Sequence, residues 1–205
     1  SVKWASCNMG ADAPEEYGDY YGWGMVNPYA VTDKPNFDVY FPYIGGTGTG
    51  QGDCGNPDKD PLTDFLKDGS KYNPATKAGE PDGIDFTAYD AASENWNGTW
   101  RLPTTKEMDE LLDSKNCDWV WRAQTTDVVG GYTVTSKVEG YEGNSIFLPA
   151  SGYLGAQGLV EKGQAANYWT ASPYDGKGQG NLKSDAWALY ITKNKNQNGN
   201  EVRYG

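Results

Sequence analysis

Acidic residues at alternate positions are the first residues whose types and spacing could do chemistry. The stretch NPDKDPLTD places Asp58 and Asp60 two residues apart, as at the start of a calcium-binding loop. It lacks the glycine and the glutamate that an EF-hand has further along, so it is not an EF-hand. EPDGID adds Asp82 and Asp85 in a second oxygen-rich turn. Each turn is a candidate site for a structural Ca²⁺, but a solvated acidic loop is the favoured interpretation of both.

Catalytic devices are restricted by the residues that the chain lacks. There is no histidine among the 205 residues, which excludes Ser-His-Asp and Cys-His triads and imidazole acid–base chemistry. Cys54 lies in a polar loop with no basic residue beside it. Carboxylate pairs arise by chance among 28 Asp and Glu residues. We therefore predict no catalytic residues and no cofactor.

The three cysteines, Cys7, Cys54 and Cys117, do not have the spacing of a metal site. An odd number allows at most one internal disulfide, for which Cys7–Cys117 is the favoured pair. Small buried thiols are the alternative.

The charge balance limits the partners. With 17 Lys and Arg against 28 Asp and Glu the formal net charge is −11, and the pI is about 4.4. Nucleic acid and anionic membrane surfaces need a basic patch, so neither is expected. No apolar run is long enough to span a membrane.

Periodicity predicts an α+β fold. SVKWASC alternates as an opening strand. A first helix is expected over 85–96, with Thr87 as its N-cap. A second follows Thr104, where Thr104 and Glu107 fit a capping box. After Cys117 the chain is strand-like up to EVRYG, which indicates a small antiparallel sheet in one loop-rich domain over 1–205.

Several segments resemble a known family. VKWASCNMGADAPEEYGDYYGWG, DAASENWNGTWRLPTTKEMDELL, CDWVW, GYTVTSKVEGYEGNSIFLPASGYLG, NYWTAS and EVRYG occur in an order that resembles the Fibrobacter succinogenes major paralogous domain. That family belongs to the C-type-lectin-like superfamily, as do the formylglycine-generating sulfatase-modifying domains. The resemblance implies two short helices, a small twisted sheet and pairing of the first and last strands, which brings the termini together. The segment at about 28–71 departs from the family and is expected to be a loop insertion.

TWRLPTT precedes the second helix as a signature of the fold. Trp100 and Leu102 are expected to point inward, and Pro103 to hold extended backbone before the cap. Arg101 is expected to grip a carboxylate, for example one of the first helix. An anionic ligand on Arg101 is the less favoured alternative.

Binding is predicted in the C-terminal third. PYDGKGQGNLKSD, between two predicted strands, is polar and rich in glycine, as recognition loops are; a plain solvated hairpin loop is the alternative. The segment from NYWTAS onward also resembles the variable segment of C-type-lectin-like proteins that retroelements diversify. Trp169 is expected to belong to the core. The candidate ligand contacts are Asn167, Tyr174, Asp175, Lys177, Gln179, Asn181, Lys183 and Trp187.

These features favour a non-catalytic ligand-binding or adhesin-type display module at the bacterial cell surface, within a larger lipoprotein or pilus protein. Its partner would be a protein or glycan on another cell or surface. The first alternative is a structural accessory domain that contacts its own chain. The second is an enzyme related to the formylglycine-generating group.

Overall fold

The computed structural model describes residues 2–22, 26–29, 90–97, 100–155, 158–173, 185–193 and 200–204. Within them the chain forms two helices, α3 (Ala91–Asn95) and α4 (Thr105–Leu112), followed by strands. The strands are β1 (Cys117–Arg122), β2 (Gly131–Ser136), β3 (Ser145–Pro149), β4 (Tyr153–Gly155), β5 (Gly158–Val160), β6 (Ala165–Pro173), β7 (Asp185–Thr192) and β8 (Asn200–Tyr204). The prediction of a mixed fold, with helices before antiparallel strands, is confirmed.

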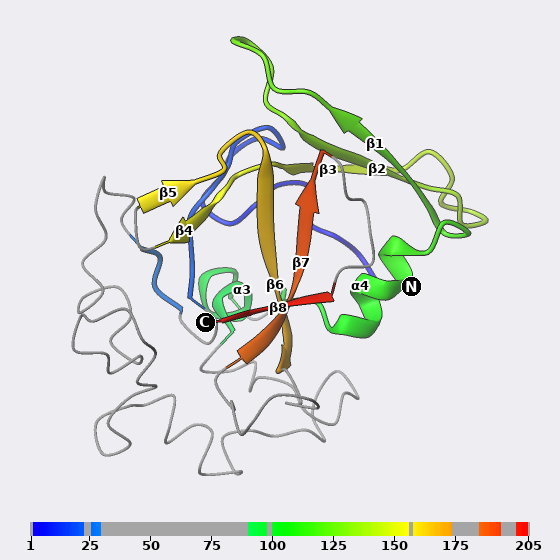
Figure 1. Cartoon of the computed structure of the whole chain (residues 1–205). Coiled ribbons are helices and arrows are strands. Elements are labelled where there is room, and N and C mark those ends of the chain that lie inside the picture. Colours follow the sequence, from blue (N-terminus) through cyan, green and yellow to red (C-terminus); the bar gives the residue numbers. More distant parts are fainter. Residues whose placement is uncertain are drawn as a thin grey trace, which may run out of the picture.

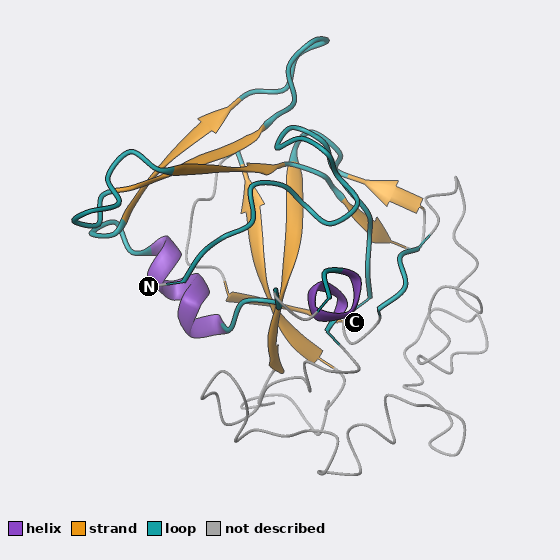
Figure 2. Ribbon diagram, turned by 180° about the vertical axis from the view of Figure 1, so that it is seen from behind, coloured by secondary structure: helices purple, strands orange, loops and turns teal. Residues whose placement is uncertain are grey.

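The described strands form three small antiparallel sheets (Figure 1). Their orders are β1-β2-β3, β4-β5 and β6-β7-β8. The long strands β6 and β7 run through the middle of the fold, with α4 packed on one side and β4 beside β6. Figure 2 shows the same arrangement from behind, with the β1-β2-β3 sheet across one end of β6 and β7.

Helix α4 begins where the sequence predicts. The Thr104 hydroxyl accepts a hydrogen bond from the Glu107 backbone N–H, and the Glu107 carboxylate accepts one from the Thr104 backbone N–H. This reciprocal capping box satisfies two N–H groups that a helix start leaves without partners. Met108 and Leu111 fall on one face and are buried.

Helix α3 is shorter than predicted. It begins at Ala91, and its N-cap is Asp90, whose side chain accepts a hydrogen bond from the Ser93 backbone N–H. The predicted cap at Thr87 is therefore wrong, and Thr87 itself lies outside the described residues. The short aspartate side chain caps a helix at least as well as threonine does. Asn97 has a positive φ of 56° just after the helix, in the predicted turn.

The main core lies between α4 and the sheets. Its buried members are Met108, Leu111, Cys117, Tyr132, Val134, Ala166, Leu189 and Ile191. Trp119 and Trp121 pack edge-on against Tyr132, at ring-centroid distances of 5.4 and 5.0 Å. The Tyr132 hydroxyl donates to the Thr192 carbonyl, which ties β2 to β7.

The predicted opening strand is not formed. Residues 2–5 have no strand assignment, although Trp4 packs on the core. Strand β8 pairs with β7 and not with the N-terminal segment. Among the described residues the N-terminal segment forms no ladder with β8, so the expected pairing of first and last strands is wrong. Of the alternating residues, Trp4 packs on the core but Val2 is 42% exposed, and alternation alone could not supply a ladder partner.

Candidate binding surface

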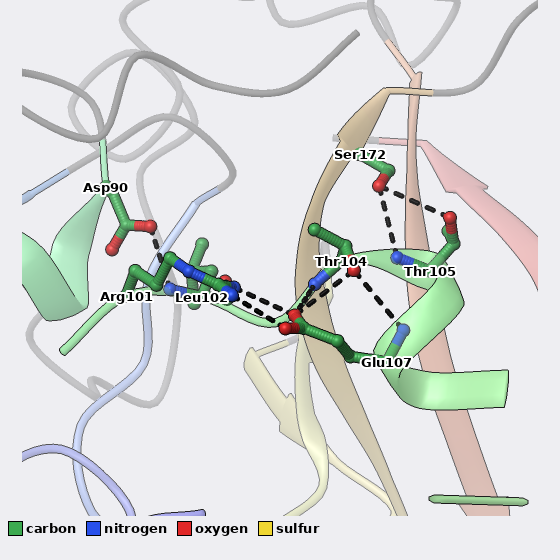
Figure 3. Close-up of polar contacts among 7 residues, drawn as sticks. All are labelled: Asp90, Arg101, Leu102, Thr104, Thr105, Glu107 and Ser172. Carbon is green, nitrogen blue, oxygen red and sulfur yellow. Dashed lines mark hydrogen bonds and ion pairs between the residues drawn. The ribbon is translucent and has the colours of Figure 1, made fainter. Parts of the chain in front are cut away.

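The segment TWRLPTT, which leads into α4 and is here called the corner, is held by hydrogen bonds to other parts of the fold (Figure 3). The Arg101 guanidinium donates two bonds to the Glu107 carboxylate, at 2.8 and 2.6 Å. The carboxylate expected from the first helix thus comes from the second. Asp90 is fully buried and also accepts from the Leu102 backbone N–H at 2.7 Å, so one carboxylate caps α3 and holds the approach to α4.

Two carboxylates in this corner have pKa values shifted in opposite directions. Burial raises the pKa of Asp90, although three backbone hydrogen bonds and nearby Arg101 oppose the rise. Burial also acts to raise the pKa of Glu107, but the bonds from Arg101 and Thr104 outweigh it and hold that pKa below its ordinary value. Arg101 is therefore fixed by a structural carboxylate, which favours an architectural role.

One side chain of the corner departs from the prediction. Trp100 was expected to point inward, yet 36% of its surface is exposed, and it packs edge-on against Trp96. Trp100 lies in the connection between α3 and α4, and one side of this connection faces solvent. Leu102 is half-buried, as an inward residue at the edge of a core would be.

The corner also fixes the end of β6. The Thr105 backbone N–H donates to the Ser172 hydroxyl at 3.1 Å, and the Ala171 N–H donates to the Pro103 carbonyl at 2.8 Å. Ser172 stands one residue before the end of β6, immediately before the predicted binding loop. A helix start and a strand end thus hold each other at the base of that loop.

Most of the predicted site residues lie outside the described residues. They are the loop positions Tyr174, Asp175, Lys177, Gln179, Asn181 and Lys183, and the metal candidates Asp58, Asp60, Asp82 and Asp85. The predicted insertion at 28–71 is described only at its first two positions. Cys54 is outside as well. In the described ranges, no three acidic or cysteine side chains gather in a group that could hold a metal ion.

The two ligand candidates that the structure describes do not share a face. Asn167 on β6 lies directly opposite Tyr190 on β7. Trp187 is three residues from Tyr190 on the same strand, and alternation turns it toward the face of buried Leu189. The structure therefore separates Asn167 from Trp187. Trp169, expected in the core, is half-buried and donates from its indole N–H to the Tyr21 carbonyl.

A cluster around Asn167 was missed by sequence reasoning. The Tyr190 hydroxyl donates to the Glu161 carboxylate at 3.2 Å, and the Tyr153 hydroxyl reaches the other oxygen of that carboxylate at 3.5 Å. Both tyrosines are half-buried and Glu161 is exposed. Asn167 shares the face of Tyr190, and its Oδ1 is buried with no hydrogen-bond partner in the described part of the chain. We call Tyr153, Glu161, Asn167 and Tyr190 the tyrosine–glutamate face.

The backbone positions this face. Gly152 N–H donates to the Ala165 carbonyl at 2.7 Å, in a bridge that lays the start of β4 alongside β6. Glu161 has φ of 56°, a left-handed conformation that non-glycine residues adopt rarely. Its carbonyl accepts from Gln164 and Ala165 in the turn that leads into β6. The left-handed conformation of Glu161 thus places its carboxylate between Tyr153 and Tyr190, which are 37 positions apart in the sequence.

The chemistry of the face is that of recognition. Tyrosine rings offer rigid apolar area with a polar end, and a carboxylate with an amide offers acceptors and donors for hydroxyl or N–H groups. The signal in the sequence was weak, because β6 and β7 must be aligned before Tyr190 can be placed opposite Asn167.

The structure corrects the disulfide prediction. Cys7 and Cys117 are both reduced thiols. The Cys7 thiol donates to the Ala11 carbonyl at 3.3 Å, while Cys117 is buried at the start of β1. Burial raises the pKa of the Cys117 thiol, which keeps it neutral and unreactive.

Comparison with known proteins gives no relative. No family model, no curated protein and no solved structure matches the chain. In the part of the chain that the structure describes, no helix has the length and apolarity needed to cross a membrane.

Proposed function

We propose that this chain is a non-catalytic ligand-binding module with a C-type-lectin-like fold, displayed at a bacterial cell surface. Two helices followed by antiparallel strands agree with that fold, apart from the N-terminal segment, which pairs with none of the described strands. The family resemblance supplies the surface setting and the larger lipoprotein or pilus protein. A protein or a glycan on another cell is the ligand class that we favour.

The placement of Asn167 is the main support for a binding role. It is a predicted contact, and it lies opposite Tyr190, whose hydroxyl bonds to the Glu161 carboxylate. Its amide oxygen has no hydrogen-bond partner among the described residues. A polar atom left unsatisfied in a native fold calls for an explanation. Because this oxygen is buried, a ligand donor would reach it after a rotation of the Asn167 side chain toward the face.

The proposed binding regions are this face, near the start of β6, and the loop at 174–184, which leaves the other end of that strand. Ser172 and the Pro173–Ala186 pair fix the ends of the loop on the scaffold. Substitutions within the loop would then change the ligand and leave the fold intact, as the resemblance to retroelement-diversified proteins implies. Sequences of the same locus from sibling isolates test this part directly. Substitutions clustered after Asn167 support it, and an even scatter contradicts it.

The binding role is tested on a glycan array and by pull-down from host surface proteins. We expect the wild-type chain to bind one ligand, and Glu161→Gln and Tyr190→Phe each to weaken binding by about tenfold. Tyr141→Ala is the matched control, because Tyr141 is 53% exposed but lies outside the face. Replacement of 174–184 by Gly-Ser should abolish binding at an unchanged melting temperature. Absence of any ligand, or binding untouched by these changes, would instead favour a structural accessory domain.

A further inference from the structure

The second surface of interest is the edge strand β1. In the order β1-β2-β3, β1 has one strand neighbour, and its other side lies at the margin of the fold in Figures 1 and 2. Val120, in the middle of the strand, is 63% exposed, the highest value among the exposed large hydrophobic residues of the described ranges. An edge of this kind can accept a further strand.

The hydrogen-bond pattern shows which backbone groups point outward. Ser136 bonds through its N–H to Asn144 and through its carbonyl to Gly143, in the turn that leads into β3. Its backbone therefore points to the β3 side, and the opposite residue, Cys117, turns its backbone away from β2. By alternation, Trp119 and Trp121 do the same. The Cys117 N–H donates a hydrogen bond to the Asp113 carbonyl. No hydrogen bond within the described residues uses the outward N–H and carbonyl groups of Trp119 and Trp121.

The sequence of β1, CDWVWR, is complementary to itself in the antiparallel direction. When two copies pair about a two-fold axis at Val120, Trp119 of each lies opposite Trp121 of the other. Both residues point their backbone outward, so each such pair exchanges two hydrogen bonds. Asp118 of each copy then lies opposite Arg122 of the other, so the dimer contains two pairs of opposite charges.

Other registers do not give this match. An axis at Trp119 places Asp118 opposite Val120, and an axis at Trp121 places Arg122 opposite Val120. Only the axis at Val120 pairs the charges and buries the exposed valine against its own copy.

The present ion pairs of the two charged residues are exposed, and such pairs contribute little to stability. Arg122 also donates from its Nε to the Val129 carbonyl at 2.9 Å, a bond that leaves its charge without a buried carboxylate. Asp118 contacts Lys137 at 2.8 Å with 63% of its side chain exposed. Arg122 contacts Glu15 at 3.5 Å while its guanidinium lies over the Phe147 ring, with 36% of the side chain exposed. Neither charge belongs to a buried ion pair, so Asp118 and Arg122 can pair across two copies without breaking one.

We infer that β1 is a homodimerisation edge: two copies of the chain join their three-stranded sheets into one six-stranded sheet about a two-fold axis at Val120. The interface is isologous, so it closes on two copies and does not propagate. It is independent of the tyrosine–glutamate face, which lies on other elements.

The test is sedimentation equilibrium of the full chain over micromolar to millimolar protein. We expect a monomer–dimer equilibrium, and Val120→Lys, which puts two like charges on the axis, to raise the dimer Kd by about tenfold or more. Val138→Lys is the matched control, since Val138 is 40% exposed and lies outside β1. It should leave the Kd unchanged.

The register has its own test. Asp118→Lys sets lysine opposite Arg122 and should also raise the Kd by about tenfold, with far-UV circular dichroism unchanged. A chain that stays monomeric at millimolar concentration would overturn the inference. So would a dimer that is indifferent to Val120→Lys. A dimer weakened by Val120→Lys but not by Asp118→Lys would refute the register.

Discussion

Ser172 accepts a hydrogen bond from the backbone N–H of Thr105, across a distance of 3.1 Å. Thr105 is the first residue of α4, so its N–H has no partner within the helix. Ser172 is buried near the end of β6. One hydroxyl thus completes a helix start and fixes the strand from which the proposed binding loop departs.

Ser172→Ala should destabilise the fold by about 1–2 kcal/mol, because it leaves the part-buried Thr105 N–H without its acceptor. Urea denaturation followed by circular dichroism measures the change. Ser145→Ala is the control, since Ser145 is exposed at the start of β3. Equal stability of the two variants would show that the contact contributes nothing.

Glu107→Gln should cost about 2–3 kcal/mol at neutral pH, since it removes the charge that accepts two bonds from Arg101. The pKa of Glu107 is lowered in the folded state from its ordinary 4.5. Its ionisation therefore stabilises the fold fully above that value, and this contribution is lost as pH falls through the folded pKa. The gap between wild type and Glu107→Gln should narrow in acid. Glu110→Gln, exposed on the same helix, should show no such gap.

Asp90→Asn should show the opposite pH dependence. The pKa of Asp90 is raised in the folded state above its ordinary 3.8. Stability from the protonated form is present below 3.8 and is lost as pH rises through the folded pKa. The advantage of wild type over Asp90→Asn should therefore be largest in acid and shrink toward neutral pH. Unfolding curves between pH 3 and pH 6 decide this, and a gap that widens with pH would contradict the assignment.

Gly152→Ala should unfold the chain more easily than Gly143→Ala. Both glycines have φ near +80°, which costs alanine about 1 kcal/mol. A Cβ at Gly152 would also collide with the Val160 carbonyl, whereas at Gly143 it meets nothing within 4 Å. We expect losses of about 3 and about 1 kcal/mol. Identical melting temperatures would exclude the close approach of β4 to β5.

Thiol labelling tests the reduced state of the cysteines. In a Cys54→Ser chain, iodoacetamide without reductant should label both Cys7 and Cys117 after unfolding, since neither is in a disulfide. In the native chain Cys117 should react much more slowly than Cys7, because it is buried and its thiol pKa is raised. Mass spectrometry of the peptides gives both rates. If labelling of Cys7 and Cys117 required reductant, the result would support a Cys7–Cys117 disulfide.

The predictions from sequence succeeded where the signal is local. Thr104 and Glu107 lie three residues apart, and their capping box needs nothing from the rest of the chain. Alternating residues such as Trp119 and Trp121 marked the strands correctly. The Asp90 cap was missed because Thr87 offered a competing start, and only the buried contact with Leu102 distinguishes the two.

The predictions failed where partners are distant. Trp4 packs on the core, but the segment around it pairs with no strand in the described part of the chain, and β8 lies against β7. The tyrosine–glutamate face joins Tyr153, Glu161 and Tyr190 through pairings that no short pattern encodes. Asn167 was singled out by resemblance, and its neighbours emerged only from the register of β6 and β7.

The pairing of Pro173 with Ala186 affects how easily the segment between them can change in length. Because the ladder clamps both ends of the intervening peptide at one spacing, the entropy of closing it rises only with the logarithm of its length, by about 0.6 kcal/mol for each doubling. Insertions and deletions there are thus almost as inexpensive as substitutions. Homologous chains should differ in the length of this segment as well as in its amino-acid sequence.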